Sequence, residues 1–369
     1  MDAVLARYVA AFRVIGPPIF LAILPVATLV WALVLMVQGD DVAVDFHHEL
    51  YPQANLLLDW ENPYPPSDAD LSDGTNFIWP TAAAAVAAPL ALLPAEVADF
   101  AATAIVVACF AAALLVMGVR DWRVFGATAL WPPFISGMQT ANLTLPLCLF
   151  AAIVWRYRDR RWIQGAALGV ALSLKFFLWP LVVWLAALRR WRAAALACVI
   201  AGASLLLILP FESLVEYARL LANLSDTFDD KGYTPFAFLV EAGVPDAAAR
   251  LVNYAIGAVL LMLTWRRRSL ALAIAAALVL SPIVWLHFFA VLALPIAAVS
   301  PRFGWIWLLP IPMILAPGTE NGASWQSALV LMVAAAVIAV AASREQGVAL
   351  RLLQPLRSGA AADERVIRA

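Results

Sequence analysis

Charged residues are scarce in this chain of 369 residues: they make up 13% of it, whereas a soluble domain carries about 25%. Hydrophobic residues account for 64%, and no water-soluble fold has enough interior to bury them. A membrane must therefore act as the solvent for most of the chain. The apolar runs lack the alternation of a transmembrane barrel, so they predict an all-α bundle of transmembrane helices.

Several other features are absent. The chain has no glycine-rich dinucleotide fingerprint, no Walker-type phosphate loop and no long basic patch with aromatic residues, so we expect neither nucleotide nor nucleic acid as a partner. The three cysteines, Cys109, Cys148 and Cys198, lie in apolar runs without zinc-type spacing, which favours core packing. No long internal repeat supports a transporter. The first apolar run, at about residues 14–37, is too long for a signal-peptide core and predicts a first transmembrane helix.

The distribution of charge predicts a topology. Arginine clusters mark the cytoplasmic side of membrane proteins. We place there Arg7 and Arg13, Arg120 and Arg123, Arg156 to Arg161, Arg189 to Arg192, Arg266 to Arg268, and the tail from Arg344 to Arg368. Residues 39–76 hold nine acids and no Lys or Arg, and residues 212–246 are also mainly acidic, so both segments are expected outside. We predict about ten crossings in a transmembrane domain of residues 1–343, with outer loops at about 38–76 and 212–248, and a cytoplasmic tail of residues 344–369.

This topology turns three segments into hairpins whose tips reach the outer side. The chain must cross an even number of times between two inner arginine clusters, which places the turn near Lys175 outside. The same reasoning puts residues 139–142 and 281–287 on that side, together with the acidic loop. The number of crossings between residues 77 and 118 stays open. Residues 77–93 and 97–118 look like two crossings, which would return the chain to the outer side, whereas Arg120 and Arg123 favour the inner side. Either one of these segments is interfacial, or the two arginines face out.

Asp45 is the candidate catalytic base, since a carboxylate at the edge of the membrane can take a proton from an acceptor hydroxyl. The alternative is a solvated loop acid. His47, His48 and Glu49 follow directly and suit a metal, but adjacent histidines rarely hold one ion together, so we expect no metal. The proline-rich turn Asn62-Pro63-Tyr64-Pro65-Pro66 is rigid and either shapes a cleft or is ordinary loop punctuation.

Lys175 and His287 are candidate ligands for a lipid phosphate. Lys175 is the single lysine in the membrane-embedded part, and ionisable groups there are expensive unless they serve a function or reach the interface. His287 lies between aromatic residues and either contacts the phosphate or belongs to the interfacial belt. Gln139 and Asn142 are candidates for sugar hydroxyls, with interhelical contacts as the alternative. In the first loop, His48, Tyr51, Asn62 and Tyr64 are the further candidates for substrate binding.

The order of these features is similar to that of a known family. The features are the early loop aspartate, Asn62-Pro63-Tyr64, the proline-bounded run from Trp79-Pro80 to Leu93-Pro94, Gln139 and Asn142, Gly165-Ala166-Ala167-Leu168-Gly169 before Lys175, and Ser281-Pro282-Ile283-Val284-Trp285-Leu286-His287. Over about residues 14–300 the chain resembles the bacterial polyprenyl-phosphate-mannose-dependent alpha-mannosyltransferases, glycosyltransferase family 87 of the GT-C superfamily. Two motifs depart from the family: Phe288 replaces a second histidine, and the spacing of the Gln139 turn is changed.

The resemblance implies a membrane-embedded hexosyltransferase of GT-C type without a cofactor. It would move a sugar, expected to be mannose, from a polyprenyl-phosphate donor to a lipid or glycan acceptor on the periplasmic face of a bacterial inner membrane. Asp45 falls on the family's presumed base, and the transfer is expected to invert the anomeric centre. Two other readings remain: a transporter or flippase of a lipid-linked sugar, which predicts buried charges spread through the membrane depth, and an inactive structural or accessory membrane protein.

Overall fold

The structure, a computed structural model, describes residues 15–367 except 73–75, 229–230 and 317–321, and it describes side chains as far as residue 346. The described residues contain helices and no strand. The helices are, in chain order, η1 (Ile19–Ile23), α2 (Leu24–Gly39), η2 (Phe46–Leu50), α3 (Tyr51–Leu58), α4 (Thr81–Ala91), α5 (Ala95–Val116), α6 (Trp122–Ala129), α7 (Pro132–Gln139), α8 (Thr144–Arg156), α9 (Arg161–Leu174), η3 (Phe176–Leu178), α10 (Pro180–Ala187), α11 (Trp191–Leu205), α12 (Leu214–Thr227), α13 (Pro235–Glu241), α14 (Asp246–Arg267), α15 (Leu270–Leu280), η4 (Leu286–Leu292), α16 (Ala293–Val299), η5 (Trp305–Leu308), η6 (Ile311–Leu315) and α17 (Ser324–Ile367).

Four described helices are long and apolar enough to cross a bilayer: Ile15–Gly39, Ala95–Val116, Asp246–Arg267 and Ser324–Gln346. The pair α7 and α8 would add a fifth span, but the two helices meet at 118°. The shorter apolar helices have 10–17 residues. This is less than the ~20 residues that are needed to cross the core of a bilayer. The all-helical membrane architecture is therefore confirmed, whereas the number of about ten crossings stays a prediction. The helix α17 also continues without a break past residue 344, where the tail was expected to begin.

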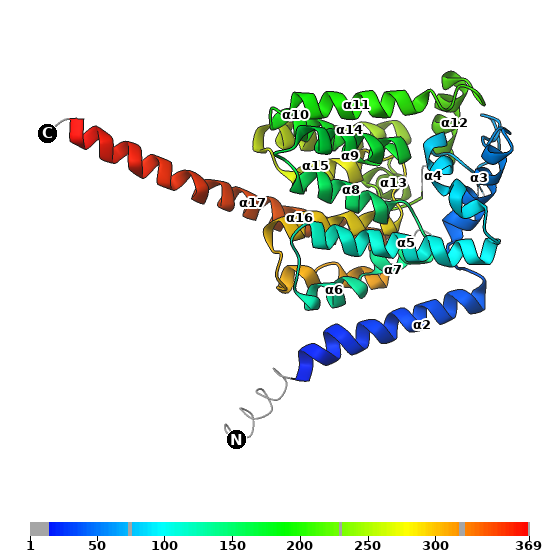
Figure 1. Cartoon of the computed structure of the whole chain (residues 1–369), viewed down its shortest axis with the longest axis horizontal. Coiled ribbons are helices and arrows are strands. Elements are labelled where there is room, and N and C mark those ends of the chain that lie inside the picture. Colours follow the sequence, from blue (N-terminus) through cyan, green and yellow to red (C-terminus); the bar gives the residue numbers. More distant parts are fainter. Residues whose placement is uncertain (1–14, 73–75, 229–230, 317–321, 368–369) are drawn as a thin grey trace.

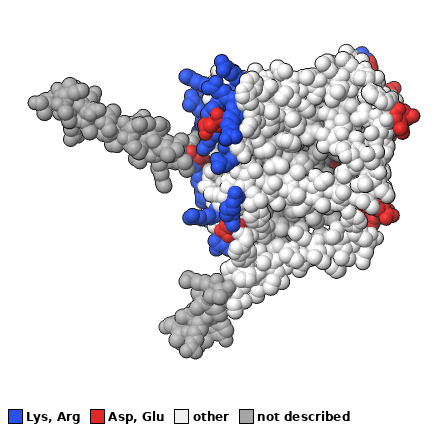
Figure 2. Space-filling view, in the orientation of Figure 1, with Lys and Arg blue, Asp and Glu red and all other residues white. Residues whose placement is uncertain are grey.

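Charge divides the molecule into two faces. Figure 2 shows most Lys and Arg side chains on one side, with a few Asp and Glu side chains among them, and further Asp and Glu side chains on the opposite side, with a broad, mostly uncharged band between. The arginine face holds the clusters at 120–123, 156–161, 189–192 and 266–268, together with Arg302 and Arg344. Contacts join these clusters: Arg190 pairs with Asp159 at 3.5 Å, Trp191 packs on Trp265, and Ser269 bonds Glu345. An apolar band between two charged faces is the pattern of a protein that spans a bilayer.

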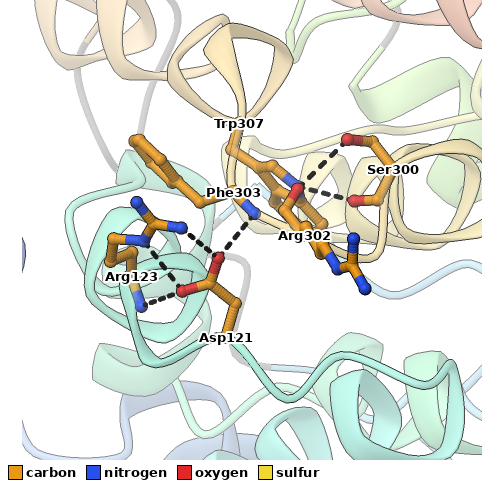
Figure 3. A network of polar contacts seen from close by, with 6 residues as sticks. All are labelled: Asp121, Arg123, Ser300, Arg302, Phe303 and Trp307. Atoms are coloured by element: carbon orange, nitrogen blue, oxygen red, sulfur yellow. Dashed lines mark hydrogen bonds and ion pairs between the residues drawn. The ribbon is translucent and has the colours of Figure 1, made fainter.

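A polar network fixes α6 at the arginine face (Figure 3). The Asp121 carboxylate accepts from the guanidinium of Arg123 at 2.8 and 2.9 Å, and from the backbone N–H of Phe303 at 3.0 Å. These bonds, chiefly those from Arg123, lower the pKa of Asp121 to about 2. The indole of Trp307 donates to the backbone carbonyls of Ser300 and Arg302 nearby. Residues 121–123 and 300–307 therefore share one face, although almost two hundred residues separate them in the sequence.

The lengths of the helices between residues 77 and 118 bear on the number of crossings there, which the sequence left open. Only α5, with 22 residues, is long enough to cross, and Arg120 donates to the carbonyls of Leu115 and Val119 at its end. The helix α4 has 11 residues, or roughly 16 Å, and follows Pro80. Ala83, Ala84 and Ala87 are buried against protein, whereas Val86 is 60% exposed. By length, α5 alone can connect the acidic segment to the arginine face, which favours the alternative in which residues 77–93 do not cross.

Three helical hairpins rise from the arginine face (Figure 1). The first runs through α7 and α8, the second through α9 and α10, and the third through α15, η4 and α16. Each begins and ends near an arginine cluster, and their tips carry Gln139 and Asn142, Lys175, and His287, respectively. The helices α3, α4 and α12 lie together at the other end of the bundle. The tips therefore meet the first polar segment, the acidic stretch that follows α2, at the acidic face.

The glycines of α9 allow it to pack closely on α11. A Cβ on Gly165 would lie 2.8 Å from the carbonyl oxygen of Ala193, and one on Gly169 would lie 2.7 Å from the Cβ of Ile200. Both distances are too short for real Cβ contacts. Small residues four apart let the backbones of membrane helices approach. This packing orients the second hairpin and thus the position of Lys175.

We expect Gly169→Ala to destabilise the protein although alanine is the better helix former. The added methyl has to displace Ile200, and overpacking of this kind costs about 1–3 kcal/mol. Unfolding of the purified protein in detergent, followed by tryptophan fluorescence, measures the effect. Gly202→Ala on α11 is the control, because a Cβ there meets nothing within 4 Å. Equal midpoints for the two variants would contradict close packing at Gly169.

Candidate functional site

A cavity of about 570 Å³ opens where the three hairpin tips meet the first polar segment. It brings together Asp45, Gln139, Asn142, Lys175 and His287, which come from four separate parts of the chain. The further lining residues are Val44, Glu49, Leu71, Ser72, Asn76, Ile78, Trp79, Pro80, Thr140, Phe176, Phe177, Trp179, Tyr217, Leu221, Leu224, Phe228, Lys231, Leu280, Ser281, Pro282, Ile283, Trp285 and Phe288. The polar residues are few and the walls are mostly apolar and aromatic, as in small-molecule sites.

Asp45 is held by the tip of the first hairpin. Its backbone N–H and that of Phe46 both donate to the carbonyl of Thr140, at 3.1 and 3.3 Å. The turn between α7 and α8 passes through Ala141, which has a positive φ of 47° that a residue with a side chain rarely adopts. Asp45 then leads into the π-helix η2, a rare helix type that recurs at functional sites. The position of the carboxylate is thus set by the backbone on both sides.

Asn142 orients the carboxylate of Asp45. Its amide nitrogen donates to Oδ2 of Asp45 at 2.5 Å, and its amide oxygen accepts from the N–H and the hydroxyl of Thr144, at 2.9 and 2.7 Å. Asn142 is 2% exposed. The sequence suggested that this side chain binds sugar, but both ends of its amide are already used within the protein. These bonds hold the Asp45 carboxylate in place, and binding of sugar by Asn142 stays a prediction.

Burial brings the pKa of Asp45 close to neutral pH. Desolvation raises its pKa to about 6, against the lowering effects of the bond from Asn142 and of the positive charge on Lys175. A base is most effective when its pKa lies near the working pH. Glu49 lies four residues further on, and burial together with the Asp45 carboxylate raises its pKa well above the usual range. Two carboxyl groups therefore face the cavity, and the charge of each disfavours ionisation of the other.

The ammonium group of Lys175 lies against aromatic rings. Its Nζ is 3.9 Å from the ring centre of Phe288 and 5.4 Å from that of Trp79. The Phe288 ring is held in turn by the edge of Phe177, with ring centres 4.9 Å apart. No carboxylate lies within ion-pair distance of Lys175 among the residues whose side chains are described. Its charge is therefore directed at the cavity and remains available to an anionic group.

His287 and Gln139 complete the polar lining. His287 is 3% exposed, and its Nε2 has no hydrogen-bond partner within the described part of the chain. A buried polar atom without a partner is unfavourable unless a ligand or water satisfies it. Gln139 lies at the end of α7, one residue before Thr140. An imidazole nitrogen, an amide and an ammonium group thus converge on the space beside Asp45.

Four residues expected to bind substrate lie outside the cavity lining. His48 is exposed, and the Tyr51 hydroxyl donates to the carbonyl of Leu93 at 2.8 Å. The Asn62 side chain accepts from the N–H of Tyr64 at 2.9 Å, which shapes the proline-rich turn. The buried Tyr64 hydroxyl donates to the carbonyl of Trp79 and bonds Thr81. The bonds of Tyr51 and Tyr64 therefore tie the first loop to the residues on either side of α4, while the bond of Asn62 shapes the loop itself.

His47 serves the same anchoring purpose on the other side of η2. Its Nδ1 lies 2.8 Å from Oδ2 of Asp99, near the start of α5. This contact fixes the π-helix against α5 while Asp45 and Glu49 face the cavity. Among the described residues no three His, Cys, Asp or Glu side chains come close enough together to hold a metal ion.

Sequence reasoning assigned no substrate role to Glu49, Trp79 or Phe288. A signal for Glu49 was present, since Asp45 and Glu49 are four residues apart and lie on one face of a helical turn. No comparable signal marked the aromatic pair around Lys175. Trp79 and Phe288 lie about two hundred residues apart in the sequence, and both face the ammonium group of Lys175 only in the folded chain.

We expect Asn142→Ala to shift the pH profile of the site's reaction upward. Loss of the Asn142 bond removes an interaction that lowers the pKa of Asp45, so the carboxylate becomes protonated at higher pH. A hydrogen bond to a charged group is worth about 1.5–3 kcal/mol, which corresponds to a shift of about one pH unit or more. The acidic limb of the rate profile, measured between pH 4.5 and 8.5, should move upward by that amount. Thr144→Ala is the control, since it leaves the bond to Asp45 in place, and an identical shift there would contradict the assignment.

Comparison with known proteins identifies the family. The model of glycosyltransferase family 87 matches residues 77–295, more than half of the chain. No curated protein and no solved structure matches. The matched segment contains Gln139, Asn142, Lys175 and His287, while Asp45 precedes it. The chain therefore belongs to glycosyltransferase family 87 and is a membrane-embedded glycosyltransferase, which uses a sugar donor and an acceptor.

Proposed function

We propose that the protein transfers a sugar, mannose in the first instance, from a polyprenyl phosphate to a lipid or glycan acceptor. The main support is that Asp45 and Lys175, a base and a free cation, line one cavity. A phosphate that already carries the sugar needs no nucleotide pocket. The apolar lining from Phe176, Trp179 and Ile283 suits the first units of a polyprenyl chain. The resemblance to mannosyltransferases is the basis for naming mannose.

The proposed reaction is a single displacement at the anomeric carbon. Asp45 removes the proton from the acceptor hydroxyl as its oxygen forms a bond to that carbon. The bond between the carbon and the phosphate oxygen breaks, and the phosphate leaves with the electron pair. Lys175 and Nε2 of His287 stabilise the charge that develops on the leaving oxygen. One displacement inverts the configuration. Gln139 is placed to bind a sugar hydroxyl, and no cofactor is required.

The two charged faces support a periplasmic active site. Arginine clusters favour the cytoplasm, so the acidic face and the cavity beside it would lie outside, in the inner membrane of a bacterium. Residues 38–76 and 212–248 then form outer segments above the cavity. Phe228 and Lys231, which follow α12, are among the residues that line it. A lipid-linked donor would enter from the outer leaflet, and about ten crossings remain our expectation for the whole bundle.

Reconstitution into vesicles tests the proposal directly. Purified full-length protein would receive radiolabelled polyprenyl-phosphate mannose, a polyprenyl-phosphate glucose, or nucleotide-linked mannose, each with crude lipid acceptors, and empty vesicles would serve as the blank. We expect transfer from a polyprenyl phosphate and none from the nucleotide sugar. Transfer from the nucleotide sugar alone would contradict the donor class. Movement of the labelled lipid across the bilayer without transfer would instead favour the flippase.

A further inference from the structure

We propose that a hollow at the arginine face binds the phosphate headgroup of an anionic membrane lipid. The hollow measures about 550 Å³ and lies at the opposite end of α9 from the sugar-transfer cavity. The 14 residues of α9 separate the two sites by roughly 21 Å. Its lining consists of Asp159, Arg160, Arg161, Trp162, Ile163 and Arg192. This site is independent of the proposed donor and acceptor.

The hollow is formed where two parallel helices begin side by side. The helix α9 begins at Arg161, α11 begins at Trp191, and α10 returns the chain between them. Their starts are close, because Gly165 in α9 lies against the carbonyl of Ala193 in α11. Neither helix has an acidic residue in its first turn or a side-chain cap. The first N–H groups of both helices thus add partial positive charge beside the arginines.

The arginine charges of the hollow are not balanced within the protein. Asp159, the one acid in the lining, pairs with Arg190, which lies outside it. Arg160 lies over the ring of Tyr157 at 5.9 Å. Arg161 and Arg192 have no carboxylate within ion-pair distance among the side chains that are described. The hollow therefore carries a net positive charge and matches a phosphodiester, to which guanidinium groups bind in forked geometry.

The surroundings favour a lipid over a soluble anion. Trp162 is 73% exposed and Trp191 is 57% exposed, beside the hollow and at the level where the charged face meets the apolar band. Exposed tryptophans at such a boundary sit among headgroups. Further along α11, Val199 is 65% exposed and offers an apolar surface to an acyl chain. Basic pockets between membrane helices on the cytoplasmic side bind anionic headgroups in this way.

The test is lipid binding to the purified full-length protein in detergent, measured by native mass spectrometry during titration with dioleoylphosphatidylglycerol. An arginine in direct contact with an anionic headgroup contributes about five-fold to the affinity, so R161Q/R192Q should weaken binding about 25-fold. R161K/R192K keeps both charges and should retain most of the affinity. R266Q/R302Q removes two exposed charges from the same face outside the hollow and should bind like the wild type. Dioleoylphosphatidylcholine should show no difference among the four proteins.

Two results would overturn the proposal. One is equal weakening by R161Q/R192Q and R266Q/R302Q, which would mean that only the general charge of the arginine face attracts anionic lipid. The other comes from a titration with inorganic phosphate alone. If the wild type bound phosphate but not the lipid, and R161Q/R192Q no longer bound phosphate, the hollow would be a site for a soluble anion. Sugar transfer by R161Q/R192Q at the wild-type rate in detergent serves as the check that this variant is folded.

Discussion

Asp45→Asn is expected to abolish sugar transfer while the protein stays folded and still binds its donor. The substitution keeps the size of the side chain and a partner for Asn142, but it removes the group that accepts the proton of the attacking hydroxyl. General base catalysis contributes about 10²- to 10⁴-fold, so the rate constant for transfer should fall within that range. The measurement is transfer of radiolabelled mannose in reconstituted vesicles under single-turnover conditions. The wild-type rate should also decline as the pH falls through about 6, because the base is then protonated.

The control for this variant is Asp59→Asn, which neutralises an exposed acid in the same polar segment outside the cavity. It should transfer at the wild-type rate. Equal rates for wild type and Asp45→Asn would remove Asp45 from the mechanism. A pH profile of Asp45→Asn that kept an acidic limb near pH 6 would also count against the assignment, since another group would then be titrating.

The distribution of charge alone predicted that one face of the protein would carry Asp45, Gln139, Lys175 and His287. Arginine clusters on either side of each apolar stretch forced the chain to return to the same face, and this placed three turns opposite the clusters. No side-chain contact had to be known for that step. The structure places these four residues around one cavity. Their roles in catalysis stay predictions, because placement alone does not measure a reaction.

Local chemistry was less predictable, because it depends on geometry that no sequence pattern encodes. The bond from Asn142 to Asp45 exists since the backbone passes through a positive φ at Ala141, where the sequence shows no glycine. Tyr51 and Asn62 looked like substrate ligands because they are polar and close to Asp45 in the chain. In the structure Tyr51 bonds the carbonyl of Leu93 behind α4 and Asn62 bonds the N–H of Tyr64, and neither residue lines the cavity.

Hydropathy alone does not show whether the segment of α4 crosses the membrane. The stretch Thr81–Ala91 is as apolar as a crossing, but its helix has only 11 residues, and Ala83, Ala84 and Ala87 are buried against other helices while Val86 is 60% exposed. A hydropathy value records that water is avoided and does not record which neighbour replaces it. The prolines at positions 80, 89 and 94 were the available signal, because they restrict the length of any helix there. The short hairpin helices raise the same difficulty for counting crossings.

Lys175→Gln is expected to cause the second large loss of activity. The ammonium group faces the cavity with no carboxylate partner, so its charge can act on the phosphate of the bound donor and on the negative charge that grows as this phosphate leaves. Removal of one such stabilising group costs about 10²- to 10³-fold in rate. Because the phosphate is charged in the donor as well as in the transition state, KM for the donor should rise while kcat falls. Initial rates over a range of donor concentrations separate the two effects.

Lys175→Arg is the informative companion, since it keeps the charge and changes the shape. The ammonium of Lys175 lies 3.9 Å from the Phe288 ring and 5.4 Å from the Trp79 ring, and a planar guanidinium is longer and bonds in a fork. We therefore expect Lys175→Arg to restore donor binding more than kcat, because a ground-state phosphate tolerates a displaced charge better than a transition state does. If Lys175→Gln transferred sugar with wild-type kcat and KM, the phosphate would have to be held elsewhere in the cavity. If Lys175→Arg and Lys175→Gln were equally impaired in both constants, the fit of the side chain between the two rings, and not its charge, would be what the reaction requires.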